Sequence, residues 1–178
     1  MHYATIKVND IANGTGVRVS LFVSGCTHRC KGCFNAEAWD FSYGQPFTSQ
    51  TEAFILQALA PDYVAGLSLL GGEPMEPANQ RALLPLLRQV KAQFPEKTVW
   101  CYTGYWLDSD LLASDGRART EATDAFLSHI DVLVDGPFEE NKKDIRLRFR
   151  GSSNQRIIDV PATLAAGKIV QKEWGDFA

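Results

Sequence analysis

The chain has 178 residues, of which 45% are hydrophobic and 22% charged, a composition typical of one soluble globular domain. Its net charge of −3 argues against a nucleic-acid-binding protein that relies on phosphate contacts, and no apolar run approaches the ~20 residues needed to span a membrane. The N-terminal residues also lack the apolar core of a signal peptide. We therefore expect a cytoplasmic protein with reduced cysteines and with no nucleic-acid or membrane partner.

Strands and helices alternate along the predicted secondary structure. Apolar or β-branched runs bounded by turn residues predict four strands, at residues 17–24, 66–70, 98–102 and 131–134. Helices are predicted near residues 50–60, 78–94 and 120–128, the second with an apolar stripe of Leu83, Leu84, Leu87, Val90 and Phe94. A capping box from Ser49 to Glu52 starts the first helix, and Pro85 predicts a kink or two abutting helices in the second.

This alternation predicts an α/β fold with a parallel sheet and outer helices. A complete eight-stranded barrel usually needs at least ~200 residues, so we expect residues 1–178 to form a single domain with a partial, open (βα) barrel. Ligands collect at the carboxyl ends of parallel strands. The unusual loops of this sequence all follow predicted strands, at the cysteines, Gly71-Gly72, Thr103-Gly104 and Asp135-Gly136. One site is therefore expected at this edge, with an open side that suits a protein substrate.

Cys26, Cys30 and Cys33 form a C-x3-C-x2-C run directly after the first predicted strand. Thiolates select zinc, copper(I) or iron–sulfur clusters, but three of them complete neither a tetrahedral zinc site nor a cluster held by four cysteines. One interpretation is structural zinc with His28 or Cys101 as the fourth ligand, although His28 is awkwardly close to its neighbouring cysteines. The other is a four-iron cubane with one iron open for chemistry.

The string C-T-H-R-C-K-G-C-F-N resembles the signature of radical S-adenosylmethionine enzymes. The resemblance implies that Cys26, Cys30 and Cys33 hold a 4Fe–4S cluster, with its fourth iron chelated by the amino and carboxylate groups of S-adenosylmethionine. It implies that Phe34 lies near the adenine and that Gly32, Cys33 and Phe34 belong to the cofactor pocket. It also implies an open barrel of the radical S-adenosylmethionine type.

Gly71, Gly72 and Glu73 follow the second predicted strand. Two glycines at a strand end are usually only a turn. Glycines followed by an acid also suit the close approach of backbone to a cationic group, which carbonyls or a carboxylate can bind. Radical S-adenosylmethionine enzymes hold the methionine amino group with a Gly-Gly-Glu motif after the second strand, and the resemblance assigns that role to these three residues.

The strings GCTHRCKGCFN, LLGGEPMEP, YTGY, DVLVDGPF and RFRGSSNQRIID resemble, in the same order, the activating proteins of anaerobic ribonucleoside-triphosphate reductase. The resemblance implies an iron–sulfur activase that receives one electron from a reductant such as flavodoxin or ferredoxin. It implies cleavage of S-adenosylmethionine to a 5′-deoxyadenosyl radical, which generates a glycyl radical on a loop of the partner reductase, with no catalytic side chain beyond the cluster and cofactor. The alternatives are an activase of another glycyl-radical enzyme, such as pyruvate formate-lyase, and a non-catalytic zinc-binding module.

Several other residues near the predicted site have two interpretations. Asp135 either binds a ribose hydroxyl of the cofactor, polarises the backbone of the partner or caps the next turn. Thr103 and Tyr105 either line the pocket or shape the end of their strand. Cys101, in the middle of a predicted strand, is expected to be a buried apolar residue.

Three alternating arginines precede the C-terminal part of the chain, and a strand would place them on one face: Arg146, Arg148 and Arg150. They are either charges on a solvated edge strand, which prevent that edge from pairing with another chain, or part of a docking surface for the partner. The polar residues at 152–156 would add hydrogen bonds to such a surface.

Overall fold

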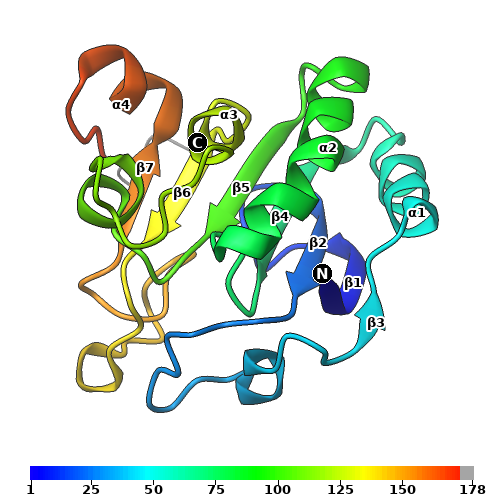
Figure 1. Cartoon of the computed structure of the whole chain (residues 1–178). Helices are drawn as coiled ribbons and strands as arrows, with labels where there is room; N and C mark the ends of the chain where they lie inside the picture. The colour runs from blue at the N-terminus through cyan, green and yellow to red at the C-terminus, as the bar shows by residue number, and fades with distance from the viewer. Residues whose placement is uncertain (173–178) are drawn as a thin grey trace.

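A computed structural model describes residues 1–172, whose strands form one open seven-stranded sheet with the order β3-β1-β2-β4-β5-β6-β7 (Figure 1). The strands are His2–Asp10 (β1), Val17–Val23 (β2), Gln45–Pro46 (β3), Val64–Gly71 (β4), Thr98–Tyr102 (β5), Val132–Asp135 (β6) and Arg156–Asp159 (β7). The α-helices are Ser49–Leu59 (α1), Pro77–Gln93 (α2), Thr123–Leu127 (α3) and Val160–Ala166 (α4). Two 3₁₀-helices and one π-helix complete the elements: Ala36–Trp39 (η1), Glu140–Lys142 (η3) and Leu107–Leu112 (η2).

The four predicted strands are β2, β4, β5 and β6, and they run parallel in the centre of the sheet. The expectation of parallel strands is wrong at both edges, where β1 pairs antiparallel with β2, β3 with β1, and β7 with β6. The chain passes from β1 to β2 and from β6 to β7 without a crossover, so β2 and β7 each run antiparallel to the strand before them, although the loop that joins β6 to β7 is long. The result is a mixed α/β sheet that does not close.

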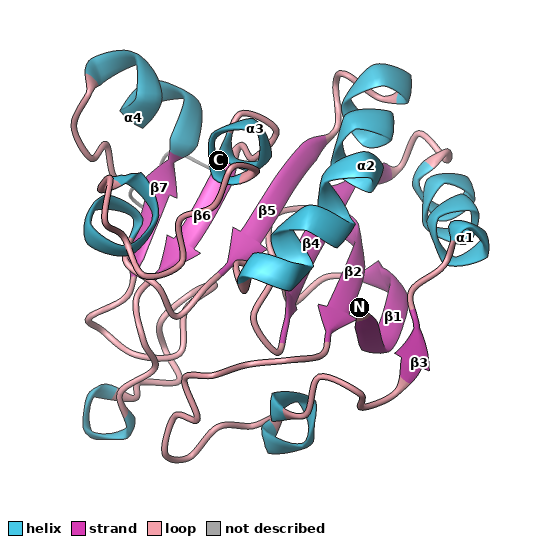
Figure 2. Ribbon diagram, viewed as in Figure 1, coloured by secondary structure: helices cyan, strands magenta, loops and turns pink. Residues whose placement is uncertain are grey.

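Helices α1, α2 and α3 cover one face of the sheet (Figure 2). Alternate residues of the central strands point to this face, among them Val19, Leu67, Val99 and Leu133. They pack with Leu87 and its neighbours on α2 in the main hydrophobic core. This packing holds the parallel strands in place independently of the loops at their carboxyl ends.

The other face of the sheet is covered by loop rather than by helix. Trp100, Val132 and Val134 belong to a separate small apolar cluster on this side. Phe149, from the long loop between β6 and β7, packs edge-on against Trp100 with ring centroids 5.1 Å apart. A cavity lies between this loop and the sheet, and it contains the candidate site.

The helices differ from their predicted starts and stripes in small ways. Thr48 caps α1 in place of Ser49. Helix α2 continues through Pro85 instead of dividing into two helices, because Pro85 lies on its exposed side where water can bond the freed carbonyl. Leu86 rather than Leu84 is fully buried on this helix. Within residues 1–172, no helix is long and apolar enough to cross a membrane.

Candidate functional site

The loops that follow the parallel strands meet at one edge of the sheet, as the sequence predicts. The N–H group of Gly72 donates to the Val23 carbonyl at 2.7 Å, and the N–H of Glu73 donates to the Gly25 carbonyl at 2.8 Å. After β5, the N–H of Gly104 donates to the Glu73 carboxylate at 2.7 Å. Three loops from distant parts of the sequence are thus joined around one site.

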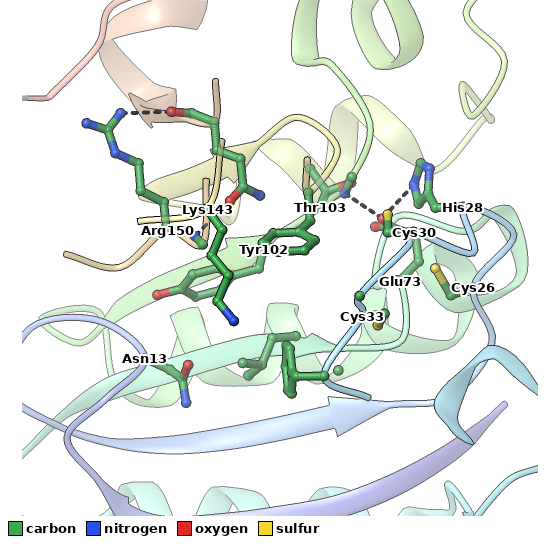
Figure 3. A pocket seen from close by; sticks show the side chains of 18 of the residues that line it. Asn13, Cys26, His28, Cys30, Cys33, Glu73, Tyr102, Thr103, Lys143 and Arg150 are labelled. Carbon is green, nitrogen blue, oxygen red and sulfur yellow. Dashed lines mark hydrogen bonds and ion pairs between the residues drawn. The ribbon is translucent and has the colours of Figure 1, made fainter. Parts of the chain in front are cut away.

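A cavity of about 570 Å³ lies beside these loops, on the face of the sheet opposite helices α1 and α2 (Figure 3). This volume is within the usual range for small-molecule sites. Its lining includes nearly all the residues predicted for the metal and cofactor sites: Cys26, Cys30, Gly32, Cys33, Phe34, Gly71, Gly72 and Glu73. Of the residues assigned to the metal or the cofactor, Asp135 alone lies outside this lining.

All four cysteines are free, and three of them line the cavity from a single irregular loop. Burial and the nearby Glu73 carboxylate raise the pKa of Cys26 to about 12, and burial also raises the pKa of Cys30. These thiols therefore keep their protons at neutral pH unless a bound cation replaces them, since metal ligation releases thiol protons. Such donors suit soft metals and iron–sulfur clusters.

The two residues proposed as a fourth zinc ligand are both engaged elsewhere. Cys101 is fully buried in the core on the helix-covered face of the sheet. His28 lies with its Nε2 atom 3.0 Å from Oε2 of Glu73. Within the described residues, no three cysteine, histidine or acidic side chains are grouped closely enough to hold a metal as they stand. The loop thus offers three thiol donors without a fourth ligand placed beside them among the described residues, and this donor set fits an iron–sulfur cluster better than closed structural zinc.

Gly71 and Gly72 allow the second loop to pass directly against the stem of the cysteine loop. Gly71 has a φ of +106°, a conformation that favours glycine. A Cβ atom on Gly72 would lie 2.7 Å from the carbonyl oxygen of Gly25 and 2.9 Å from that of Ala38. Both contacts are with backbone, so a side chain here would displace the cysteine loop.

Glu73 connects the loops through its carboxylate. The side chain is 1% exposed, and Oε1 accepts a hydrogen bond from the Met75 N–H at 2.8 Å. Oε2 accepts from Gly104 and lies beside His28, whose ring packs on Tyr105 with centroids 4.3 Å apart. Glu73 therefore borders the cavity while its oxygens bind three loops together.

Thr103 and Tyr105 have different places at the end of β5. Thr103 lines the cavity, and its Oγ1 accepts a hydrogen bond from the Tyr105 N–H at 3.1 Å, which shapes the turn. Tyr105 is buried and packs on His28, outside the lining. Thr103 thus combines the two roles considered for it, whereas Tyr105 supports the cysteine loop.

Asp135 is occupied by structural contacts. It is fully buried, and its carboxylate accepts hydrogen bonds from Arg156 and from the Leu107 N–H, the latter at 2.9 Å. Arg156 also packs over the Trp106 ring at 4.8 Å. These contacts join the start of η2 to β7, and they leave Asp135 away from the cavity.

The three alternating arginines do not lie on a strand, contrary to the prediction. Residues 144–150 form turns and bends within the 136–155 loop, which leaves the sheet after β6 and returns at β7. Arg146 pairs with Asp144 at 2.8 Å, whereas Arg150 lines the cavity and donates to the Gln155 carbonyl at 2.8 Å. A loop has no alternation of faces, so these side chains point in different directions.

Comparison with known proteins places this site in a family. A family model described as a 4Fe-4S single cluster domain matches residues 12–158. The anaerobic ribonucleoside-triphosphate reductase-activating protein of Pasteurella multocida is 45% identical over 159 residues, which cover 88% of this chain and 96% of that protein. The chain belongs to the family of these activating proteins. Members from Haemophilus influenzae and Escherichia coli K12 are each 43% identical over 159 residues, covering 88% of this chain and 97% of theirs.

The sequence did not identify several residues that line the cavity of this member of the activating-protein family: Asn13, Tyr102, Lys143, Phe149 and Gln155. One of them had a usable signal. Strand alternation places Tyr102 opposite Cys101, so a buried cysteine on the helix side implies a tyrosine on the cavity side. Asn13 and the residues of the long loop gave no such signal, because their positions depend on how loops cross the sheet.

Proposed function

We propose that this chain is a radical S-adenosylmethionine enzyme that generates a glycyl radical on anaerobic ribonucleoside-triphosphate reductase. One observation carries the proposal: three free thiols and the Gly-Gly-Glu turn border one cavity, in a chain of the activating-protein family. The match to a 4Fe-4S single cluster domain supports the cofactor. The iron–sulfur activase is the function that this site supports best.

When bound, a reduced 4Fe–4S cluster would supply one electron for reductive cleavage of the sulfonium C–S bond of S-adenosylmethionine, which would yield methionine and, after hydrogen abstraction from a glycine of the partner, 5′-deoxyadenosine. The thiolates of Cys26, Cys30 and Cys33 would hold three irons. The chain contributes position and exclusion of side reactions, since the cofactor carries the chemistry.

The remaining lining residues have matching roles in this proposal. Gly71 and Gly72 would allow backbone carbonyls to approach the methionine amino group, and the Glu73 carboxylate would lie nearby. Gly32 gives the cysteine loop a φ of +74°, and Phe34, 83% exposed at the cavity, provides an apolar surface for the adenine. Asp135 is not included, because its carboxylate is occupied by Arg156.

The proposal extends to the fold and the cellular setting. The open sheet with helices on one face supports a partial barrel of the radical S-adenosylmethionine type, as a single domain over residues 1–178; residues 173–178 lie outside the described part. An external one-electron reductant such as flavodoxin or ferredoxin would reduce the cluster in the cytoplasm.

The test is radical transfer to a defined partner. The anaerobically reconstituted protein, chemically reduced and supplied with S-adenosylmethionine, is incubated with anaerobic ribonucleoside-triphosphate reductase or with pyruvate formate-lyase. We expect a glycyl-radical signal only with the reductase, together with methionine and 5′-deoxyadenosine. A radical only on pyruvate formate-lyase would reassign the substrate, and no cleavage product with either partner would contradict the proposal.

The 136–155 loop, termed the flap here, is proposed to contact the partner. It carries five basic and three acidic side chains in a chain of net charge −3. Ile145, at the cavity, is 91% exposed, and Arg146 beside it has an 88% exposed side chain. An apolar side chain next to basic groups at the cavity mouth suits an acidic protein surface.

Substitution of the flap should separate partner activation from cofactor cleavage. We expect Arg146→Glu, at a flap residue outside the cavity lining, to lower the rate of glycyl-radical formation about tenfold or more, because the reversed charge opposes the partner. Cleavage of S-adenosylmethionine without partner should stay at the wild-type rate. Arg81→Glu changes an exposed arginine of α2 outside the cavity and serves as control. Equal activation by the flap variant and wild type would rule out this docking role.

A further inference from the structure

The first half of the cysteine loop is held by backbone hydrogen bonds at its start and by side-chain contacts at the residues that follow. The N–H groups of Gly25 and Cys26 donate to the carbonyls of Ala38 and Trp39, at 2.8 and 3.2 Å. The next residue, Thr27, instead donates to one carboxylate oxygen twice: its N–H and its Oγ1 lie 2.7 and 2.6 Å from Oε1 of Glu76. The Glu76 carboxylate therefore holds the loop at the residue that follows the two backbone contacts.

The Glu76 side chain binds the cysteine loop rather than capping its own helix. It is 5% exposed and occupies the N-cap position of α2, yet its side chain makes no capping bond there. Burying a carboxylate is costly unless hydrogen bonds compensate it, and bonds to a charged acceptor are stronger than neutral ones. The doubled bond from Thr27 is such a compensation, so the two residues form a strong local contact.

The same short segment holds the loop at the next residue as well. Glu73 lies against His28, so residues 73–76 provide carboxylates to two successive positions between the first two cysteines. The start of α2 adds a further bond, since Asn79 Nδ2 donates to the Ser24 carbonyl at 3.0 Å and to the Glu73 carbonyl at 2.9 Å. The segment that carries Gly71 and Gly72 therefore also sets the path of the cysteine loop.

Glu76 acts at a distance from the chemistry. Neither Glu76 nor Thr27 lines the cavity, whereas Cys26 and His28, on either side of Thr27, both do. Thr27 is exposed and can be changed without opening the core. This pair therefore makes no direct contact with a ligand in the cavity and would influence it through the position of the loop.

We propose that Glu76 is a positioning residue that acts through Thr27. It fixes the cysteine loop relative to the Gly-Gly-Glu turn and so sets the position of the thiols relative to the S-adenosylmethionine site. The inference rests on the proposed function. Without the contact, the loop should move more freely, lose iron more readily and bind S-adenosylmethionine more weakly. The sheet and its helices should stay folded, because the main core contains neither residue.

The test compares Glu76→Ala, Thr27→Val and Thr27→Ser with wild type, with Glu121→Ala as control. Glu121 is an exposed carboxylate that pairs with Arg81 outside the cavity. Three properties are measured: backbone hydrogen exchange of residues 26–33 in the metal-free protein, iron retained after desalting, and KM against kcat for cleavage of S-adenosylmethionine. Circular dichroism and the melting temperature report the fold.

Glu76→Ala and Thr27→Val should both speed exchange in this loop, retain less iron and raise KM about 10- to 100-fold, the usual effect of losing an outer partner of a metal site. Thr27→Ser keeps the hydroxyl and should match wild type, as should Glu121→Ala. If both test variants lower only the melting temperature and leave exchange, iron and KM unchanged, the contact is merely structural and the inference is overturned. A wild-type protein that takes up no 4Fe–4S cluster would instead contradict the proposed function, and exchange in the metal-free protein would still decide the role of Glu76.

Discussion

Cys30→Ala should abolish cleavage of S-adenosylmethionine and leave the protein folded. Cys30 lies on an irregular loop, lines the cavity and is absent from the main hydrophobic core. Two remaining thiolates would not hold a cubane that needs three protein ligands here, so iron should fall to near zero. The fold should persist because the sheet and helices pack without the loop. Iron and acid-labile sulfide, cleavage products and circular dichroism are the measurements.

Cys101→Ala is the matched control for this substitution. Cys101 is fully buried on β5, where it pairs with Leu69 and Leu133 of the neighbouring strands. Its loss should cost roughly 1 kcal/mol of unfolding free energy and leave iron content and cleavage unchanged. If Cys30→Ala unfolds the protein instead, the loop metal contributes folding free energy as structural zinc does, and the enzymatic account would be wrong.

Gly72→Ala should have the second-largest effect, on the geometry of the site. The added methyl group would meet the backbone oxygens of Gly25 and Ala38, neither of which can rotate away. We expect a loss of roughly 1–3 kcal/mol in unfolding free energy from overpacking. Displacement of the cysteine loop should also lower iron retention and cleavage about 10- to 100-fold. Urea unfolding and cleavage assays measure the two parts.

Gly167→Ala separates backbone strain from damage to the site. Gly167 follows α4 with a φ of +64°, and nothing lies within 4 Å of an added Cβ atom. The substitution should cost about 1 kcal/mol from the left-handed conformation alone and leave cleavage at the wild-type rate. Gly72→Ala activity equal to that of Gly167→Ala would mean that the close approach at Gly72 does not shape the site.

The centre of the fold was predictable because each parallel strand is a short apolar run followed by a loop of special residues. The edges were not. Strand β3 has two residues, and β7 is defined by its pairing with β6 rather than by its own pattern. Arg18 shows the same limit: it is fully buried in β2 and donates to Ser68 and Thr98, a contact that only the assembled sheet creates.

The candidate site was predictable for residues whose type and spacing indicate their chemistry. It was less predictable for residues whose role depends on contacts with distant parts of the chain. The cysteines and the Gly-Gly-Glu turn were found from spacing and resemblance, and the structure places them on one cavity. Asp135 looked similar at the end of its strand, yet Arg156, 21 residues away, occupies its carboxylate. The bond from Thr27 to Glu76 spans 49 residues and has no local signal.

The most direct test of the central claim is an electron paramagnetic resonance spectrum of the anaerobically reconstituted, reduced protein, recorded with and without S-adenosylmethionine. The account predicts a reduced-cluster signal whose shape changes when S-adenosylmethionine is added, because the cofactor binds the open iron. An iron-free, silent sample that carries zinc would contradict it and would make the cysteine loop a structural metal site.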